Sequence, residues 1–293
     1  MRKTFVDIGT QVVDGNEKAT ILLGDIGAFG FRNLIARHPK RVFNIGILEQ
    51  SMIGVAAGMA SNGHVPIVHT IAPFLIDRAF EQVKVDFGYQ NLPVNLVSVG
   101  ASYDYSSLGC THHAPEDIGI LSQIPGVNFF MPGHAEEFRA QFLDNWDNGG
   151  INYFRLSESQ NSSVNQTNHG DAHLIKSGNL LTILVVGPLL DSVADAVRDL
   201  DVEILYVNSA LSDQVLSMPT GIPSGKILIV EPYYSGFILG KMIDQLSERG
   251  ARISQLGVPK SFIRKYGSVQ EIQKYLNLDS PSIRAKVQEL ISK

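Results

Sequence analysis

Short apolar runs rich in Val, Ile and Leu alternate along this chain with segments whose apolar residues have helical spacing. In the first half, the runs predict strands at Ala19–Leu23, Pro66–Thr70, Pro93–Val99, Val127–Phe130 and Ile151–Leu156. The segments between them predict helices at Phe29–Arg37, Glu49–Asn62, Phe74–Gly88, Pro115–Gln123 and His134–Asp147. Continuous apolar strands that alternate with helices are typical of a parallel α/β sheet.

The alternation is interrupted between Ser157 and Asn179, where the chain is polar, has no period and is dense in turn-forming residues. Beyond it, strands and helices are predicted at Leu180–Val186, Leu190–Leu200, Glu203–Val207, Lys226–Val230, Gly236–Arg249, Val269–Tyr275 and Ser280–Ser292. We therefore expect two successive α/β domains, at 1–160 and 179–293, joined by a linker at 161–178. Each domain should contain a mainly parallel sheet flanked by helices.

Composition and charge narrow the class of protein. The 293 residues are 44% hydrophobic and 18% charged, as in an ordinary globular protein rather than a disordered one. The net charge of −5 argues against general nucleic-acid binding. The one cysteine, Cys110, can form neither an internal disulfide nor a Cys-x-x-Cys metal site. Because no apolar run reaches membrane-spanning length and no signal-peptide segment is visible, we expect a cytoplasmic protein.

A carboxylate stands at the start of the second predicted helix, Glu49–Asn62. Glu49 follows two apolar residues directly. One interpretation is a first-turn carboxylate stabilised by the helix dipole. The other is a desolvated carboxyl with a raised pKa that shares a proton with a ligand nitrogen. Further along this helix, Gly54, Ala57 and Gly58 form a face of small residues, which suggests close packing against another helix, across a subunit interface for example.

Two later segments place aromatic residues and histidines at strand-to-helix junctions. Phe74 and Phe80 either belong to the core or offer a stacking surface to a planar ring. His112 and His113 are adjacent, and neighbouring side chains diverge, so they do not form a metal-binding pair. Their loop either caps the next helix through Thr111 or His113, or presents a histidine as a proton donor or general acid/base.

Three motifs follow one another in the first half: Gly46…Glu49-Gln50, Thr70-Ile71…Phe74…Arg78-Ala79 and Gly109-Cys110-Thr111-His112-His113. The second half contains Val230-Glu231-Pro232 and Gly257-Val258-Pro259…Tyr266-Gly267. In this order and spacing, they resemble the pyrimidine-binding domain and the C-terminal domain of transketolase. The resemblance implies a thiamine diphosphate-dependent transferase of carbohydrate metabolism, which moves a two-carbon ketol unit to an aldehyde or sugar acceptor.

The resemblance also implies roles for single residues. Glu49 would be catalytic and contact N1′ of the cofactor's aminopyrimidine, since a buried carboxyl kept near neutrality can share a proton with a ring nitrogen at pH 7. Phe74 would stack on the aminopyrimidine, and His112 would be the second catalytic residue, facing the substrate. The remaining positions of the cofactor-binding motifs are Gln50, Ile71 and Asp77. The remaining substrate positions are Thr111, His113 and Arg2.

Several positions depart from the transketolase pattern. The family's first stacking phenylalanine is Ile71 here, and its third aromatic residue is Asp77. An upstream loop histidine corresponds to Gly100, and the phosphate-binding Ser-Arg corresponds to Ser157-Glu158, which puts a negative charge where a sugar phosphate would bind. We therefore expect a different donor or acceptor, such as a modified or nucleotide-linked sugar.

The part of the family that binds Mg²⁺ has no counterpart in this sequence. In transketolases, Mg²⁺ holds the diphosphate through a Gly-Asp-Gly…Asn motif on another domain. No Gly-Asp-Gly occurs in the 293 residues. We therefore expect a split enzyme in which an N-terminal-half partner subunit holds Mg²⁺ and the diphosphate, assembled as an α2β2 heterotetramer.

Two other interpretations stay open. The chain could be the β subunit of a 2-oxoacid dehydrogenase, or of a pyruvate-using synthase with the same domains. It could also be a non-catalytic scaffolding subunit that kept the fold. The joint presence of Glu49, Phe74 and Thr111-His112 favours an enzyme.

Overall fold

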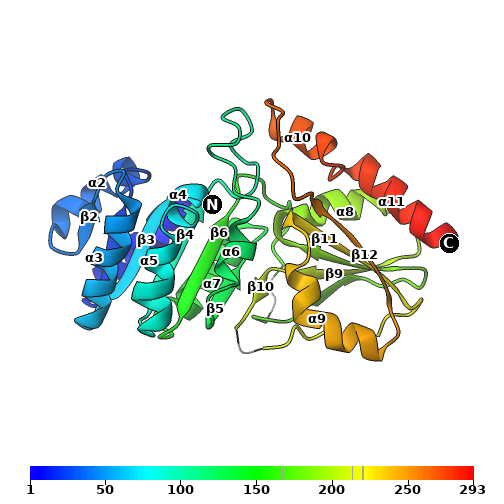
Figure 1. Ribbon diagram of the computed structural model, residues 1–293, viewed down its shortest axis with the longest axis horizontal. Helices are drawn as coiled ribbons and strands as arrows, with labels where there is room; N and C mark the ends of the chain where they lie inside the picture. Colours follow the sequence, from blue (N-terminus) through cyan, green and yellow to red (C-terminus); the bar gives the residue numbers. More distant parts are fainter. Residues whose placement is uncertain (166–167, 213, 220) are drawn as a thin grey trace.

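The computed structural model describes residues 1–165, 168–212, 214–219 and 221–293. Its strands form two sheets that lie side by side (Figure 1). The seven-stranded sheet has the order β10-β5-β6-β4-β3-β1-β2, and the five-stranded sheet has the order β12-β11-β8-β9-β7. All described pairings between these strands are parallel except β10 with β5 and β7 with β9. The predicted fold class, two mainly parallel α/β sheets flanked by helices, is confirmed.

The seven-stranded sheet has helices on both faces. Its strands are β1 (Ala19–Leu23), β2 (Val42–Asn44), β3 (Val65–Ile71), β4 (Val94–Val99), β5 (Val127–Phe130), β6 (Ile151–Leu156) and β10 (Ser209–Ala210). One face packs against α1 (Arg2–Gly15), α2 (Ala28–Arg37) and α7 (Ala135–Asn145). The other packs against α3 (Glu49–Ser61), α4 (Ala72–Leu75), α5 (Phe80–Gln82), the π-helix η1 (Val83–Tyr89) and α6 (Asp117–Leu121). Because both faces are covered, β1, β3, β4 and β6 are buried along their whole length.

The five-stranded sheet is built from the second half of the chain. Its strands are β7 (His173–Lys176), β8 (Thr182–Val186), β9 (Glu203–Val207), β11 (Lys226–Tyr234) and β12 (Arg252–Val258). The helices of this half are η2 (Gly187–Leu189), α8 (Leu190–Ala196), α9 (Phe237–Glu248), α10 (Val269–Tyr275) and α11 (Ser280–Ser292). Residues of α8, α10 and α11 pack on one face of this sheet, and α9 packs on the other.

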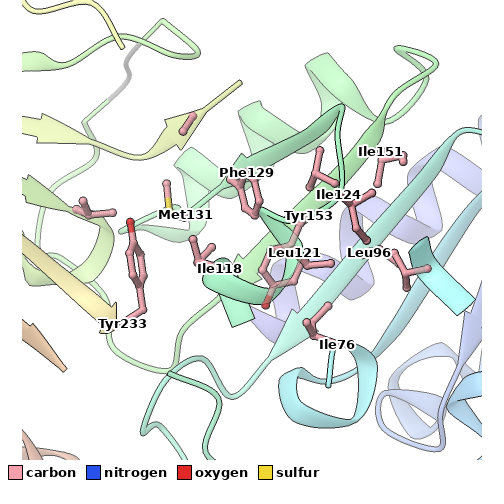
Figure 2. Close-up of a cluster of buried hydrophobic side chains, with 14 of the residues drawn as sticks. Ile76, Leu96, Ile118, Leu121, Ile124, Phe129, Met131, Ile151, Tyr153 and Tyr233 are labelled. Carbon is pink, nitrogen blue, oxygen red and sulfur yellow. The ribbon is translucent and has the colours of Figure 1, made fainter. Parts of the chain in front are cut away.

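The two sheets share one hydrophobic core. Its buried side chains come from both halves of the chain, and Figure 2 shows Tyr233 of β11 beside Ile118 and Met131 of the first half. The short strand β10, from the second half, also pairs with β5 and extends the first sheet. The domain limits at 1–160 and 179–293 stay a prediction, and the range 161–178, predicted as a linker, contains β7.

A buried ion pair lies where the two halves meet. The Asp117 carboxylate accepts hydrogen bonds from Arg155 Nε and from the Tyr153 hydroxyl, each at 2.7 Å. The side chains of Arg155 and Asp117 are 2% and 0% exposed. Arg155 also donates to Ser102 Oγ at 2.6 Å, and that hydroxyl donates to the Pro232 carbonyl of β11. Arg155 of the pair therefore connects β6, through Ser102, to the second half of the chain.

The predicted elements differ from the observed ones in three ways. The strands at Ala19–Leu23, Val127–Phe130, Ile151–Leu156 and Glu203–Val207 have the predicted bounds, as do the helices at Val269–Tyr275 and Ser280–Ser292. The continuous helix predicted over Phe74–Gly88 is wrong, because the segment forms α4, α5 and η1. Of the two interpretations of the histidine loop, the one in which Thr111 or His113 caps the next helix is wrong, because α6 begins at Asp117 with Glu116 at its N-cap. Elements without a sequence prediction are α1, β2, β7, η2, β10 and β12.

None of the helices in the described residues is both long and apolar enough to span a bilayer.

Candidate functional site

The candidate site lies at the carboxyl ends of the strands in the seven-stranded sheet. In this sheet β2 lies on one side of β1, whereas β3 and β4 lie on its other side, so the strand order reverses between β1 and β3. Ligands of open α/β sheets bind beside such a switch point. Glu49 follows β2, Phe74 follows β3, and His112 follows β4. Three segments that are far apart in sequence are therefore brought to one edge of the sheet.

Glu49 is the first residue of α3 and is 1% exposed. The turn before it is fixed by Asn44, whose Oδ1 accepts hydrogen bonds from the backbone N–H of Gly46 at 3.1 Å and of Asp25 at 3.0 Å. Gly46 has φ +80°, a left-handed conformation that glycine adopts without steric cost. Glu49 Oε2 accepts a hydrogen bond from Arg78 Nη1 at 2.6 Å. Its other oxygen, Oε1, is buried and has no hydrogen-bond partner among the described residues.

Arg78 connects Glu49 to the aromatic part of the site. Its guanidinium carbon lies 4.3 Å from the centre of the Phe74 ring, within the range of a cation–π contact. On the same ring, His112 makes an edge-to-face contact with a centroid distance of 5.3 Å and an angle of 71°. The order in space is therefore Glu49, Arg78, Phe74 and His112. Arg78 belongs to the second sequence motif, but it was not predicted as a site residue. The Arg-Ala pair that ends this motif is the feature of the sequence that could have indicated it.

The loop that carries His112 is supported from both halves of the chain. Thr111 Oγ1 and His112 Nδ1 are 2.9 Å apart, which fixes the orientation of the imidazole ring. Ser106 Oγ donates to the Gly267 carbonyl at 2.7 Å. Gly109 has φ +74°, and a Cβ placed there would lie 2.3 Å from the ring of Tyr266. The second half of the chain therefore contacts the histidine loop directly.

The other predicted site residues lie around this group. Ile71 is 7% exposed and packs in the core, so its side chain offers no open stacking surface in this chain. His113 is buried and lines a small cavity with Cys110, Glu116 and Tyr234. Gln50 and Asp77 are exposed. Arg2 lines a different cavity of about 290 Å³, together with Lys3, Phe5, Gly27 and His69.

Burial and neighbouring charges shift several pKa values near the site. Although Asp77 reaches the surface, the protein around its carboxyl group partly desolvates it, and together with the carboxylates of Glu116 and Asp117 this raises its pKa to about 7. Burial raises the pKa of Glu116 and lowers that of His113. Burial also lowers the pKa of His69 to about 4, so this imidazole is neutral at pH 7. Its Nδ1 lies 2.8 Å from the Val97 carbonyl, to which it donates.

Asp104 gives a prediction about pH. Its carboxylate accepts hydrogen bonds from Ser157 Oγ and the Glu158 backbone N–H, each at 2.9 Å, and burial raises its pKa from 3.8 to about 7. Between these pH values, the native chain holds a proton that the unfolded chain releases, so stability falls as pH rises. We expect Asp104→Asn to remove this pH dependence of the free energy of unfolding. Over the whole range from pH 3.8 to about 7, it amounts to at most about 4 kcal/mol. Urea unfolding at several pH values measures it.

The exposed Glu136 provides the control for that experiment. Glu136→Gln should change the free energy of unfolding by less than about 1 kcal/mol, since exposed ion pairs contribute little. A stability difference between wild type and Asp104→Asn that stays constant from pH 4 to pH 7 would contradict the raised pKa, because the proton uptake is the source of the slope.

The chemistry of the site fits one part of a thiamine diphosphate molecule. A buried carboxylate oxygen without a partner is costly unless a ligand donates to it, and a protonated ring nitrogen is a suitable donor. The Phe74 ring, half-buried beside it, is suited to contact a flat heterocycle. Within the described ranges, no group of three or more His, Cys, Asp or Glu residues is arranged to hold a metal ion.

Comparisons with known proteins agree with this fit. The sequence profile of the transketolase pyrimidine-binding domain matches residues 8–162, more than half of the chain. An uncharacterized 33.6 kDa protein of the fasciation locus of Rhodococcoides fascians is 33% identical over 95% of this chain and 91% of its own length. One of the subunits of the apulose-4-phosphate transketolase of Actinobacillus succinogenes is 29% identical over 96% of this chain and 91% of its own.

The likeness extends to a solved structure of similar length. A split-gene transketolase, described as an inactive β4 tetramer, superposes with a TM-score of 0.82 at 23% identity and covers 99% of this chain and 97% of its own. At this identity, the likeness concerns the fold, which is shared along the whole chain. The chain therefore belongs to the transketolase family and corresponds to the pyrimidine-binding and C-terminal half of its split, thiamine diphosphate-dependent members.

Proposed function

We propose that this chain, with an N-terminal-half partner subunit, transfers a two-carbon ketol unit from a ketose donor to an aldehyde or sugar acceptor. The observation that carries the proposal is the buried Oε1 of Glu49, which has no hydrogen-bond partner among the described residues, in a site where Arg78 connects Glu49 to Phe74 and Phe74 contacts His112. When bound, thiamine diphosphate supplies the nucleophilic carbon on which the two-carbon unit is carried. This chain's residues then bind and orient the aminopyrimidine and move protons.

Each residue has a distinct task in this proposal. Glu49 Oε1 accepts a hydrogen bond from the proton-bearing N1′ of the aminopyrimidine, and the low-dielectric surroundings strengthen that hydrogen bond. The Phe74 ring contacts the flat face of the heterocycle. His112, whose ring is held by Thr111, faces the substrate and donates a proton to the oxygen that becomes negative during transfer.

The partner subunit would cover the exposed side of this site and hold Mg²⁺ and the diphosphate. Ile47 and Leu48, directly before Glu49, are 67% and 58% exposed, which is unusual for adjacent large apolar residues. On α3, a Cβ at Gly58 would meet no atom within 4 Å, so another backbone can approach this face closely. These features support an interface at α3, with the α2β2 heterotetramer as the proposed assembly.

A binding experiment tests the split site. We expect the isolated chain to bind thiamine diphosphate weakly, with or without Mg²⁺, because the groups that ligate the diphosphate belong to the partner. Binding in the reconstituted pair should be tight and should depend on Mg²⁺. Isothermal titration calorimetry measures both, with thiamine, which lacks the diphosphate, as the control ligand. Tight Mg²⁺-dependent binding by the isolated chain would refute a shared site.

We further propose that the substrate is a modified or nucleotide-linked sugar rather than an ordinary ketose phosphate. The Tyr105 ring fills the space over Gly100, where a Cβ would lie 2.2 Å from it. Burial raises the pKa of the Tyr105 hydroxyl; the Arg2 guanidinium opposes this shift, and the carboxyl groups of Glu158 and Asp104 add to it. A phosphate dianion bound beside Tyr105 would be repelled by the negative charge of Glu158. A donor screen with the reconstituted pair, comparing ketose phosphates, unphosphorylated ketoses and pyruvate, tests this and separates transketolase from pyruvate-using chemistry.

A further inference from the structure

The Glu49 carboxylate has one hydrogen-bond partner in the described part of the chain, and that partner is Arg78. The contact is asymmetric. Oε2 is bound at 2.6 Å, a short distance that is typical of a charge-assisted hydrogen bond, whereas Oε1 is left without a partner. A carboxylate has two equivalent oxygens and a broad torsional preference about its last bond. Any distinction between the two oxygens must therefore come from the surroundings, and Arg78 provides it.

The second contact of Arg78 fixes the guanidinium itself. Its carbon lies 4.3 Å from the centre of the Phe74 ring, and the planar guanidinium is suited to such contacts on aromatic faces. The Arg78 side chain is 39% exposed, so it is not held by burial alone. One residue thus bonds to the carboxylate and contacts the ring, the two groups that the proposed function assigns to the aminopyrimidine.

We propose that Arg78 is a positioning residue that fixes the rotation of the Glu49 carboxylate, so that Oε1 meets the aminopyrimidine nitrogen, and that keeps the Phe74 ring in place beside it. This inference rests on the proposed function. Arg78 does not contact the reacting carbon in this proposal; it acts by holding Glu49 and Phe74 in place.

The first test measures hydrogen–deuterium exchange at C2 of the cofactor in the reconstituted pair. Arg78→Ala should slow the exchange by about 10- to 100-fold, the range expected for one hydrogen bond to a charged group. Arg78→Lys should recover only part of the loss, because an ammonium has the charge but not the planar fork. The matched control is Arg198→Ala, since Arg198 is 80% exposed and pairs with Asp195 on the surface. That control should leave the exchange unchanged.

The second test uses readouts that a general loss of structure would not produce. Added guanidinium at a non-denaturing concentration should restore part of the exchange in Arg78→Ala, but not in the double variant Glu49→Gln/Arg78→Ala. Calorimetry gives a readout without catalysis. The wild-type pair should bind thiamine diphosphate more tightly than an analogue with CH in place of N1′, and this preference should shrink by about 10-fold in Arg78→Ala.

The outcomes separate this inference from the proposed function. If Glu49→Gln leaves the exchange unchanged, the proposed function fails. If Glu49→Gln slows it but Arg78→Ala does not, only the positioning role is overturned. The positioning role is also overturned if Arg78→Ala slows the exchange, but added guanidinium restores none of it and the preference for N1′ is unchanged. A merely structural role of Arg78 would give that result. If Arg78→Ala does not assemble with the partner, the preference for N1′ is measured in Arg78→Lys and Arg78→Gln, and an unchanged value there overturns the inference.

Discussion

Glu49→Gln is expected to slow exchange of the C2 proton of bound thiamine diphosphate by about 10²- to 10⁴-fold in the reconstituted pair, the range of general acid–base catalysis. The carboxylate is 1% exposed, so water cannot replace its function. A glutamine keeps the size and still accepts one hydrogen bond, but it cannot take up or return a proton at pH 7. Glu49→Gln therefore removes the proton transfer between the side chain and the ring nitrogen but keeps the shape of the site.

The exchange is followed by NMR after dilution into deuterium oxide and acid quench at different times. Cofactor affinity should fall far less than the exchange rate, since glutamine still fills the site. The matched control is Glu81→Gln, because Glu81 is an exposed carboxylate near the site that contacts only Gln82 among the hydrogen bonds described for it. Exchange in Glu49→Gln within a factor of about two of wild type would rule out the role of Glu49.

The strands buried on both faces were the elements best predicted from the sequence. β5, β6 and β9 are short, mainly apolar runs, a pattern that is typical of the strands in an α/β protein. β2 and β12 were not predicted because they lie at the edges of their sheets, where partial exposure breaks the apolar run. α1 was not predicted because its start is charged, although its buried residues Phe5, Ile8 and Val12 have helical spacing in the sequence.

The segment after β3 shows why local pattern is not enough. The helical spacing from Phe74 to Gly88 predicts one helix, but the backbone leaves it between Leu75 and Phe80. In this irregular turn, the Arg78 side chain reaches Glu49, which precedes it by 29 residues. A contact between residues so far apart depends on the pairing of β1, β2 and β3. The motifs identified Glu49, Phe74 and His112, whereas the role proposed for Arg78 required coordinates.

The largest effect on stability is expected at Asp117. Asp117→Asn should lower the free energy of unfolding by about 3–5 kcal/mol, because it leaves the buried guanidinium of Arg155 without a counter-charge. The two side chains are 0% and 2% exposed, so solvent cannot compensate. The loss should also loosen the contact with the second half, since Arg155 holds Ser102, which in turn bonds to the Pro232 carbonyl.

Urea unfolding at pH 7 measures this effect, and two variants separate charge from packing. Removing both charges in Asp117→Leu/Arg155→Met should cost less than Asp117→Asn alone, since a buried ion pair can be replaced by apolar residues at little cost, whereas one unpaired charge cannot. The exposed pair of Glu136 and Arg139 is the control, and Glu136→Gln should cost under about 1 kcal/mol. If Asp117→Asn costs no more than this control, the ion pair does not stabilise the junction. The contact between the two halves would then depend on the apolar core around Ile118, Met131 and Tyr233.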